Sequence, residues 1–285
     1  MFPIRIHRPG RFVGLPDAQA ISSTRGNVLR TLGLALPLLA TTGCTWLSYL
    51  GTDERGSDRG RIYFVGGAGS VGNVVGTIDV PRGLRQAGYR GSIEVFGWQS
   101  VVGGTLRDLM DRPRNEGEAR RLAKRIQDYL DQHPGRRVDI IALSAGTGIT
   151  AWALESLPPD YRVGTVVFLG SALSRTYDLS PALCRIDGHL YAFYSDRDPL
   201  LKFGLALTGS VDREFAGAAG LYGFAPPPEA DESARRTYRE KLRTRPYRSD
   251  YANHGYFGLH ADSTSPAFVA KVVYPLLTEP PPAPK

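Results

Sequence analysis

The sequence predicts an α/β domain whose core is a doubly wound, mostly parallel β-sheet. From residue 61 onward, five short and almost continuously apolar runs alternate with stretches of helical character. Such runs are typical of parallel strands, because both faces of a parallel sheet are buried under helices. A glycine or serine directly follows each run, as expected where a strand ends in a turn. The five predicted strands are residues 62–65, 93–96, 138–143, 163–169 and 190–194.

Helical periodicity fills the gaps between several of these runs. Apolar residues recur at three- and four-residue spacing between Leu122 and Leu130, and His133-Pro134-Gly135 then ends that helix. Residues 147–157 are predicted as a helix that ends before two prolines, and the last helix of the chain follows Ser265-Pro266. This alternation favours crossover helices on both faces of the sheet.

The folded domain is predicted to span residues 61–278 of the 285. Residues 216–250 are rich in glycine and proline, then basic, and show no strand pattern, so we interpret them as an insertion or lid. Residues 279–285 are a proline-rich tail. Hydrophobic residues make up 42% of the chain and charged residues 22%, which favours a globular protein over a fibrous or disordered one.

Residues 1–44 have the features of an export leader and are left out of the predicted fold. Arg25 and Arg30 precede an apolar run, 31–40, that is too short to span a bilayer, which takes about 20 apolar residues. The polar residues 45–60 are interpreted as a tether between this leader and the folded domain.

The end of the leader, Leu39-Ala-Thr-Thr-Gly43-Cys44, resembles a bacterial lipobox. In that motif the cysteine is lipidated and becomes the new N-terminus. The resemblance therefore implies a lipid anchor on Cys44, contact with a membrane and a place in the cell envelope. A leader without a lipid, or a cytoplasmic protein with an apolar N-terminal segment, are the open alternatives.

The net charge of +7 does not predict a nucleic-acid partner. Residues 1–61 hold eight arginines against four acidic residues, so they carry +4 and leave only +3 for the rest of the chain. The basic cluster Arg235–Arg248 also contains an acidic residue, as solvated helix faces do. Two cysteines, Cys44 and Cys184, provide no disulfide framework, and no metal-binding motif such as HExxH occurs.

The clearest chemical motif is Ser144, which directly follows a predicted buried strand and precedes a predicted helix. A serine there must make a very tight turn, which requires small neighbours such as Ala142 and Gly146. The turn exposes the hydroxyl and places the N–H of Ala145 where an oxyanion would form. This pattern resembles the nucleophile elbow of α/β hydrolases, with Ala142 in the place of the usual glycine. The alternative is a helix N-cap without chemistry.

A second glycine cluster, Gly66-Gly67-Ala68-Gly69, follows the first predicted strand. In α/β hydrolases such a turn supplies the other oxyanion N–H, and the resemblance points to Gly67 or Ala68. Gly67–Gly72 also matches GxGxxG, the dinucleotide fingerprint. That alternative requires an acidic residue at the end of the next strand, and none follows residues 93–96.

The acid and the histidine are assigned by their order after Ser144. Asp198 follows the fifth predicted strand and matches the position of the acid in the α/β-hydrolase family, with Asp196 in reserve. Either could instead make a local Asx turn. For the histidine we predict His254, because its surroundings resemble the family's histidine loop, with His260 in reserve. We expect His254 to contact both Ser144 and Asp198.

The resemblance implies a serine hydrolase that cleaves a carboxylic ester or a related acyl bond of a small molecule through a covalent acyl-enzyme, without a cofactor. Two alternatives come from other classes of protein. One is a noncatalytic, surface-anchored binding protein with the same fold, and the other is an NAD(P)-binding oxidoreductase. The sequence predicts no oligomeric state.

Overall fold

The computed structural model describes residues 50–100, 104–202, 211–212 and 217–279. All described residues belong to one compact unit, Gly43–Lys285. The predicted leader and the lipobox cysteine therefore lie outside the described residues.

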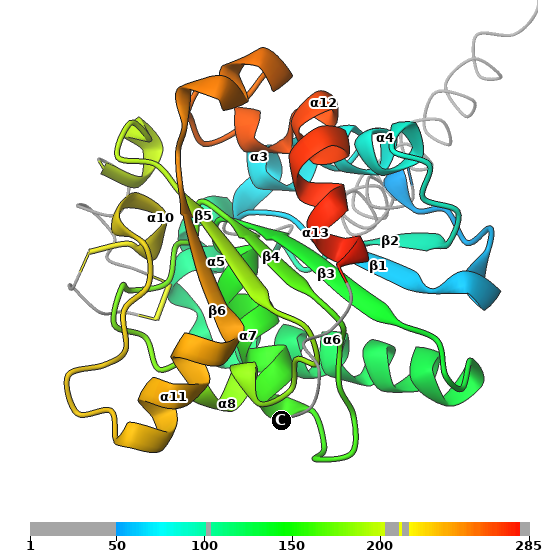
Figure 1. Ribbon diagram of the computed structural model, residues 1–285, viewed down its shortest axis with the longest axis horizontal. Coiled ribbons are helices and arrows are strands. Elements are labelled where there is room, and N and C mark those ends of the chain that lie inside the picture. Colours follow the sequence, from blue (N-terminus) through cyan, green and yellow to red (C-terminus); the bar gives the residue numbers. More distant parts are fainter. Residues whose placement is uncertain (1–49, 101–103, 203–210, 213–216, 280–285) are drawn as a thin grey trace, which may run out of the picture. The chain divides into compact units, whose positions relative to one another are not determined.

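A six-stranded parallel sheet forms the centre of this unit (Figure 1). The strand order β2-β1-β3-β4-β5-β6 reverses direction next to β1, which pairs with both β2 and β3. This confirms the doubly wound α/β prediction. Ligands of such sheets bind beyond the carboxyl ends of the strands where the order reverses. The strands are β1 Arg61–Val65, β2 Ser92–Phe96, β3 Val138–Leu143, β4 Val166–Leu169, β5 Leu190–Tyr194 and β6 Leu242–Pro246.

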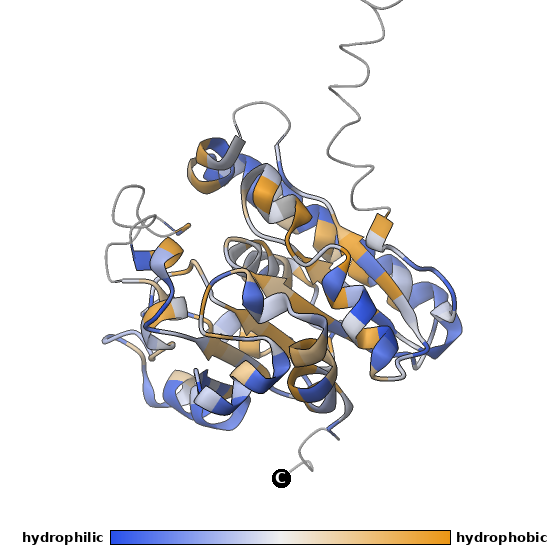
Figure 2. Ribbon diagram, turned by 90° about the horizontal axis from the view of Figure 1, so that it is seen from above, coloured by the Kyte–Doolittle hydropathy of each residue, from blue (hydrophilic) through white to orange (hydrophobic). Residues whose placement is uncertain are grey.

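Helices cover the sheet on both faces, and alternate residues of strands β1 to β5 pack into two separate hydrophobic clusters. In β1, Tyr63 and Val65 face one cluster, whereas Ile62 and Phe64 face the other. Figure 2 shows the strands as mostly hydrophobic and the helices as more hydrophilic on their outer sides. The first cluster includes side chains of α6 Arg112–Gln132, α7 Gly146–Ser156, α8 Ser180–Leu183, α10 Ala219–Tyr222 and α11 Glu232–Lys241. The second includes side chains of α4 Asp79–Gln86, α12 Pro266–Phe268, the π-helical segment η4 Val269–Val273 and α13 Tyr274–Thr278.

The remaining helical elements of the described residues are short. They are α3 Gly69–Val74, α5 Gly104–Met110 and the 3-10 segments η1 Ser57–Arg59, η2 Ser249–His254 and η3 Asp262–Thr264. No helix among the described residues has the length and hydropathy needed to cross a bilayer.

Two expectations about segment boundaries are wrong. Residues 216–250 were expected to contain no strand, yet β6 pairs in parallel with β5 over its whole length. It is an edge strand with alternating charged side chains, and edge strands are commonly polar, so it lacks the apolar run of a central strand. Within the expected tether, Asp53 pairs with Ile93 of β2 through two hydrogen bonds of 2.8 Å.

Candidate active site

Ser144 lies in the turn between β3 and α7, in a strained backbone conformation. Its φ of 55° is the only positive value at a non-glycine residue of the described chain. Side chains at positive φ cost energy, and such strain gathers at functional sites. The Ser144 N–H donates to the Leu169 carbonyl of β4 at 3.0 Å, and its carbonyl accepts from Thr147 N and Oγ1. The turn is therefore held from both sides, as the predicted elbow requires.

Gly146 is required by the tight packing of this turn against the loop after β1. A Cβ at this position would lie 2.4 Å from the carbonyl oxygens of both Val65 and Gly66. These are backbone atoms, so relief would require the strand and the turn to separate. Ala142, the other small neighbour, is completely buried in β3.

Gly146→Ala is therefore expected to destabilise the protein by roughly 3 kcal/mol, the upper part of the range for overpacking. The measurement is the free energy of unfolding in urea. Gly117→Ala is the matched control: Gly117 lies inside α6, and its Cβ would meet no atom closer than 3.9 Å. We expect the control to gain about 0.5–1 kcal/mol from helix propensity. Equal effects of the two changes would contradict the packing argument.

The backbone of Gly67 lies beside Ser144. A Cβ on Gly67 would be 3.2 Å from Ser144 Cβ and 3.6 Å from its Oγ. Two side chains from the loop after β2 fix this turn: Trp98 Nε1 donates to the Gly66 carbonyl at 2.8 Å, and Gln99 Nε2 donates to the Gly67 carbonyl at 2.7 Å. Ala68 follows as the N-cap of α3, and Ala145 is the N-cap of α7. The loops therefore bring all three candidate oxyanion donors to the end of the sheet that carries Ser144.

Asp108 of α5 ties the same two loops together from a fully buried position. Its Oδ2 accepts from Gly69 N at 2.8 Å, its Oδ1 accepts from Ser100 N at 2.8 Å, and Arg114 pairs with it at 3.3 Å. Trp98, Gln99 and Asp108 were not identified from the sequence. The only local signal was the Trp98-Gln99 pair directly after a strand, because the partners of Asp108 are set by the fold.

Asp198, after β5, is 2% exposed and is held by local and distant partners. Its Oδ1 accepts from Leu200 N at 3.0 Å and Leu201 N at 3.1 Å, and its Oδ2 pairs with His260 Nδ1 at 2.6 Å. Because a carboxylate only accepts, Nδ1 carries the hydrogen of this bond, and Nε2 is the ring nitrogen with a free lone pair. Asp196, the reserve acid, is exposed.

The expected pairing of His254 with Asp198 is wrong, since Asp198 pairs with His260. His254 ends η2 and is half-buried, and its carbonyl accepts from Ser265 Oγ at 2.8 Å. After it, Gly255 and Gly258, both with positive φ, turn the chain back toward the sheet. Residue 260, six positions later, is the one that reaches Asp198.

The end of β4 lies close to both Ser144 and His260. A Cβ on Gly170, the residue after β4, would lie 3.3 Å from His260 Nδ1 and 3.6 Å from Asp198 Oδ2. The residue before it, Leu169, accepts the N–H of Ser144. The strained serine and the histidine–carboxylate pair thus flank the end of one strand.

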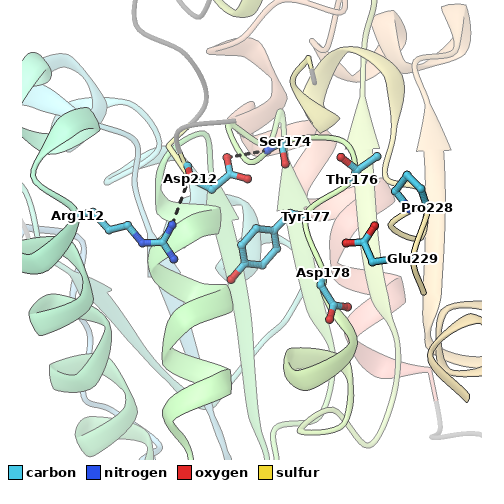
Figure 3. A pocket seen from close by; sticks show the side chains of 8 residues that line it. All are labelled: Arg112, Ser174, Thr176, Tyr177, Asp178, Asp212, Pro228 and Glu229. Carbon is cyan, nitrogen blue, oxygen red and sulfur yellow. Dashed lines mark hydrogen bonds between the residues drawn. The ribbon is translucent and has the colours of Figure 1, made fainter. Parts of the chain in front are cut away.

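A polar pocket of about 400 Å³ lies further along the loop that follows β4 (Figure 3). Ser171, at the start of that loop, shares a hydrogen bond of 2.8 Å with Thr147 of the elbow. Two buried atoms of the lining, Ser174 Oγ and Asp212 Oδ2, have no hydrogen-bond partner among the described residues. The lining residues are Arg112, Ser174, Thr176, Tyr177, Asp178, Asp212, Pro228 and Glu229.

Glu155 of α7 lies behind this pocket, where the Tyr177 hydroxyl donates to its Oε1 at 2.7 Å. Burial raises the pKa of Glu155 from 4.5 to about 7. A raised pKa means that the folded state favours the protonated form, so this contribution to stability is complete below pH 4.5 and is lost as the pH rises through 7.

Glu155→Gln should therefore flatten the decrease in the free energy of unfolding between pH 5 and pH 8, by at most about 1.4 kcal/mol per pH unit. Urea unfolding at both pH values measures this difference. Asp160→Asn, at an exposed turn, is the control and should follow the wild type. If the free energy of unfolding of Glu155→Gln decreased between pH 5 and pH 8 as much as that of the wild type, the raised pKa of Glu155 would be contradicted.

Comparisons with known proteins found similar chains only among solved structures. No family model matches the chain, and no curated protein matches it. Among solved structures, the chain is similar to a cutinase of Trichoderma reesei in complex with a phosphonate inhibitor, with a TM-score of 0.39 and 16% identity over 88% of this chain and 93% of that one. It is also similar to an esterase of Pyrococcus furiosus, with a TM-score of 0.44 and 14% identity over 74% and 77%.

The parallel sheet, its strand order and the strained serine between β3 and α7 define the α/β-hydrolase fold. Within the described residues, no cluster of three or more histidine, cysteine, aspartate or glutamate side chains is arranged to hold a metal ion.

Proposed function

We propose that the protein is a serine hydrolase that cleaves a carboxylic ester through Ser144, His260 and Asp198. The observation that supports it best is the pairing of His260 with Asp198 above Gly170, beside the strand whose end also holds the strained Ser144. Each member follows a different parallel strand, so the three converge at the carboxyl end of the sheet.

In the proposed reaction, His260 Nε2 takes the proton of Ser144 while Oγ attacks the ester carbonyl carbon. Asp198 keeps the hydrogen on Nδ1 and stabilises the imidazolium. The N–H groups of Ala145 and of the Gly67–Ala68 turn stabilise the oxyanion of the tetrahedral intermediate. His260 then gives the proton to the leaving alcohol, and water hydrolyses the acyl-enzyme in the reverse sequence of proton transfers.

Labelling with a fluorophosphonate probe tests this proposal, followed by mapping of the labelled peptide and assays with p-nitrophenyl esters of graded chain length. We expect one label, on Ser144, and hydrolysis that depends on acyl length. A protein that neither labels nor hydrolyses any ester would favour the noncatalytic binding protein instead. Binding of NAD(P) without labelling and without ester hydrolysis would favour the oxidoreductase.

We further propose that Cys44 is lipidated and anchors the protein to a membrane of the cell envelope. The support is the lipobox resemblance together with the apolar run 31–40. The wild-type protein is expected to partition into the detergent phase of Triton X-114, and Cys44→Ser should move it to the aqueous phase or leave it unprocessed. Cys184→Ser is the control and should partition as the wild type does. A wild-type protein that keeps Met1 and stays in the aqueous phase would contradict the anchor.

A further inference from the structure

The large hydrophobic side chains that are exposed in the described residues share one end of the sheet. There are ten, with exposed fractions from 45% to 75%. Eight of them lie in segments that directly follow the carboxyl end of a strand: α3 after β1, α5 after β2, the loop and α10 after β5, and the loop after β6. The ten are Leu50, Val71, Val74, Ile78, Leu106, Met110, Leu200, Tyr222, Phe257 and Leu259.

The other two, Leu50 and Ile78, belong to the same end. Asp53 pairs with Ile93 in antiparallel fashion, and Thr52 Oγ1 accepts from Val95 N at 3.1 Å. Because this pairing is antiparallel, the residues that precede Asp53 lie toward the carboxyl end of β2, and Leu50 is among them. A Cβ on Gly51 would touch the carbonyl of Thr77, which precedes Ile78. We call this set of ten side chains the carboxyl-end surface.

The opposite end of the sheet is different, because its exposed turns are polar. They carry charged or polar residues such as Arg90, Gln132, Arg136, Asp160 and Asp187. Isolated apolar side chains on a surface are ordinary, but their gathering at one end of the sheet marks an interaction site.

The short stretch of chain between Cys44 and Leu50 indicates which partner binds this surface. Cys44 precedes Leu50 by six residues, which span at most about 20 Å when extended. A lipid on Cys44 would therefore hold Leu50, one member of the carboxyl-end surface, within that distance of a bilayer.

We propose that the carboxyl-end surface docks on a lipid bilayer, so that the end of the sheet that carries Ser144 faces the membrane. This proposal rests on the proposed membrane anchor and not on the chemistry of Ser144. Apolar side chains that enter the interface contribute in proportion to the area they bury, and a lipid anchor needs such a second contribution for stable attachment.

Depth-dependent quenching tests the orientation. The full chain with Cys184→Ser is reconstituted in phosphatidylcholine vesicles that contain nitroxide lipids, with a fluorophore on Val71→Cys or on Gln132→Cys. Any label on Cys44 is the same in both proteins. We expect strong quenching at position 71 and little at position 132. Equal quenching at the two positions, or none at either, would overturn the proposal.

A second test introduces negative charges into the carboxyl-end surface and needs no fluorophore. The full chain with Cys44→Ser, Val71→Asp, Leu106→Asp and Tyr222→Asp should bind phosphatidylcholine vesicles at least about tenfold more weakly than Cys44→Ser alone. Its hydrolysis of a soluble ester should be unchanged, which shows that the fold is intact. Undiminished vesicle binding would overturn the proposal, and so would a dimer in solution that these changes dissociate. If no ester is hydrolysed by either protein, circular dichroism replaces the assay and the docking result still stands.

The polar pocket of Figure 3 carries a second, independent inference. Its lining has three carboxylates, Asp178, Asp212 and Glu229, against the single guanidinium of Arg112. Arg112 already pairs with Glu116 at 3.0 Å and stacks over Trp152. Asp212, 6% exposed, has one oxygen on Ser174 N and the other without a partner among the described residues, and Ser174 Oγ is likewise unpartnered.

We infer that this pocket binds a small organic ammonium group. Three carboxylates and one guanidinium line the pocket, and the buried Asp212 Oδ2 has no partner among the described residues, so a ligand that donates hydrogen bonds fits this lining. The net negative charge of the lining favours a cation. The ring of Tyr177, which lies between these carboxylates in Figure 3, adds a face that attracts cations. A volume of about 400 Å³ accommodates a small molecule or one such group of a larger one.

Calorimetric titration of the full chain with propylammonium, and with propionate as the matched anion, tests this inference. We expect saturable binding of propylammonium only, weakened at least about tenfold by Glu229→Gln or Asp212→Asn, because a charge-assisted hydrogen bond is lost. Asp160→Asn, distant from the pocket, and Ser144→Ala should bind as the wild type does. Equal binding of propionate, or no saturable binding of propylammonium, would overturn the inference.

Discussion

Ser144→Ala is expected to abolish fluorophosphonate labelling and to lower the rate of ester hydrolysis by about 10⁴–10⁶, the usual cost of losing a member of a catalytic triad. Without the hydroxyl, no acyl-enzyme forms, and the oxyanion donors alone support only weak hydrolysis by water. The fold should survive, because alanine occupies the same strained backbone position and the backbone hydrogen bonds of Ser144 to Leu169 and Thr147 remain. Initial rates with a p-nitrophenyl ester, and circular dichroism of both proteins, measure the two effects.

Ser171→Ala provides the matched control. Ser171 is also a buried serine just beyond the carboxyl end of a strand, and its hydroxyl bonds to Thr147 of the elbow. The same hydroxyl accepts from Leu173 N at 3.2 Å. Ser171 lacks the strained backbone, so we expect its replacement to cost activity less than about tenfold, because only neutral hydrogen bonds are lost. A Ser144→Ala protein that labels fully would refute the proposed nucleophile.

His260→Ala is expected to match Ser144→Ala in severity, whereas His254→Ala should keep its activity within about threefold, as surface changes away from a site do. His260 holds the bond to Asp198 and has the free Nε2 that the proposed base needs. His254 contributes its backbone carbonyl to Ser265, and that contact does not need the imidazole. The measurement is kcat/KM for a soluble ester in each single variant.

The double variant Ser144→Ala, His260→Ala sharpens this comparison. Members of one triad act as a unit, so the double variant should be no slower than either single one. Losses that multiply would show that the two residues act separately. A large loss in His254→Ala with an active His260→Ala would reverse the histidine assignment while leaving Ser144 as the nucleophile.

The sequence by itself determined five of the six strands of the parallel sheet and the tight turn at Ser144, because the signals for both are local. A strand buried on two faces needs a continuous apolar run, and the turn at Ser144 needs Ala142 and Gly146 close by in sequence. The position of Asp198 directly after β5 was likewise predictable, because the acid sits within a few residues of a strand end. Such local requirements leave their pattern in consecutive residues.

The tertiary structure decided which histidine meets Asp198. His254 and His260 lie six residues apart in one loop, and the choice depends on the turns at Gly255 and Gly258 and on aromatic packing of Tyr251 and Tyr256 against Phe268. These contacts join residues distant in sequence, and no local pattern records them.

The tertiary structure also decided which residues support the turn Gly66–Gly69 and which form the carboxyl-end surface. Asp108 reaches Gly69 across 39 positions of the chain, and Trp98 reaches Gly66 across 32. Val71, Leu106 and Tyr222 each resemble ordinary buried residues in the sequence. Only the parallel arrangement of the strands, which brings every loop after a strand to the same end of the sheet, places them together in contact with solvent.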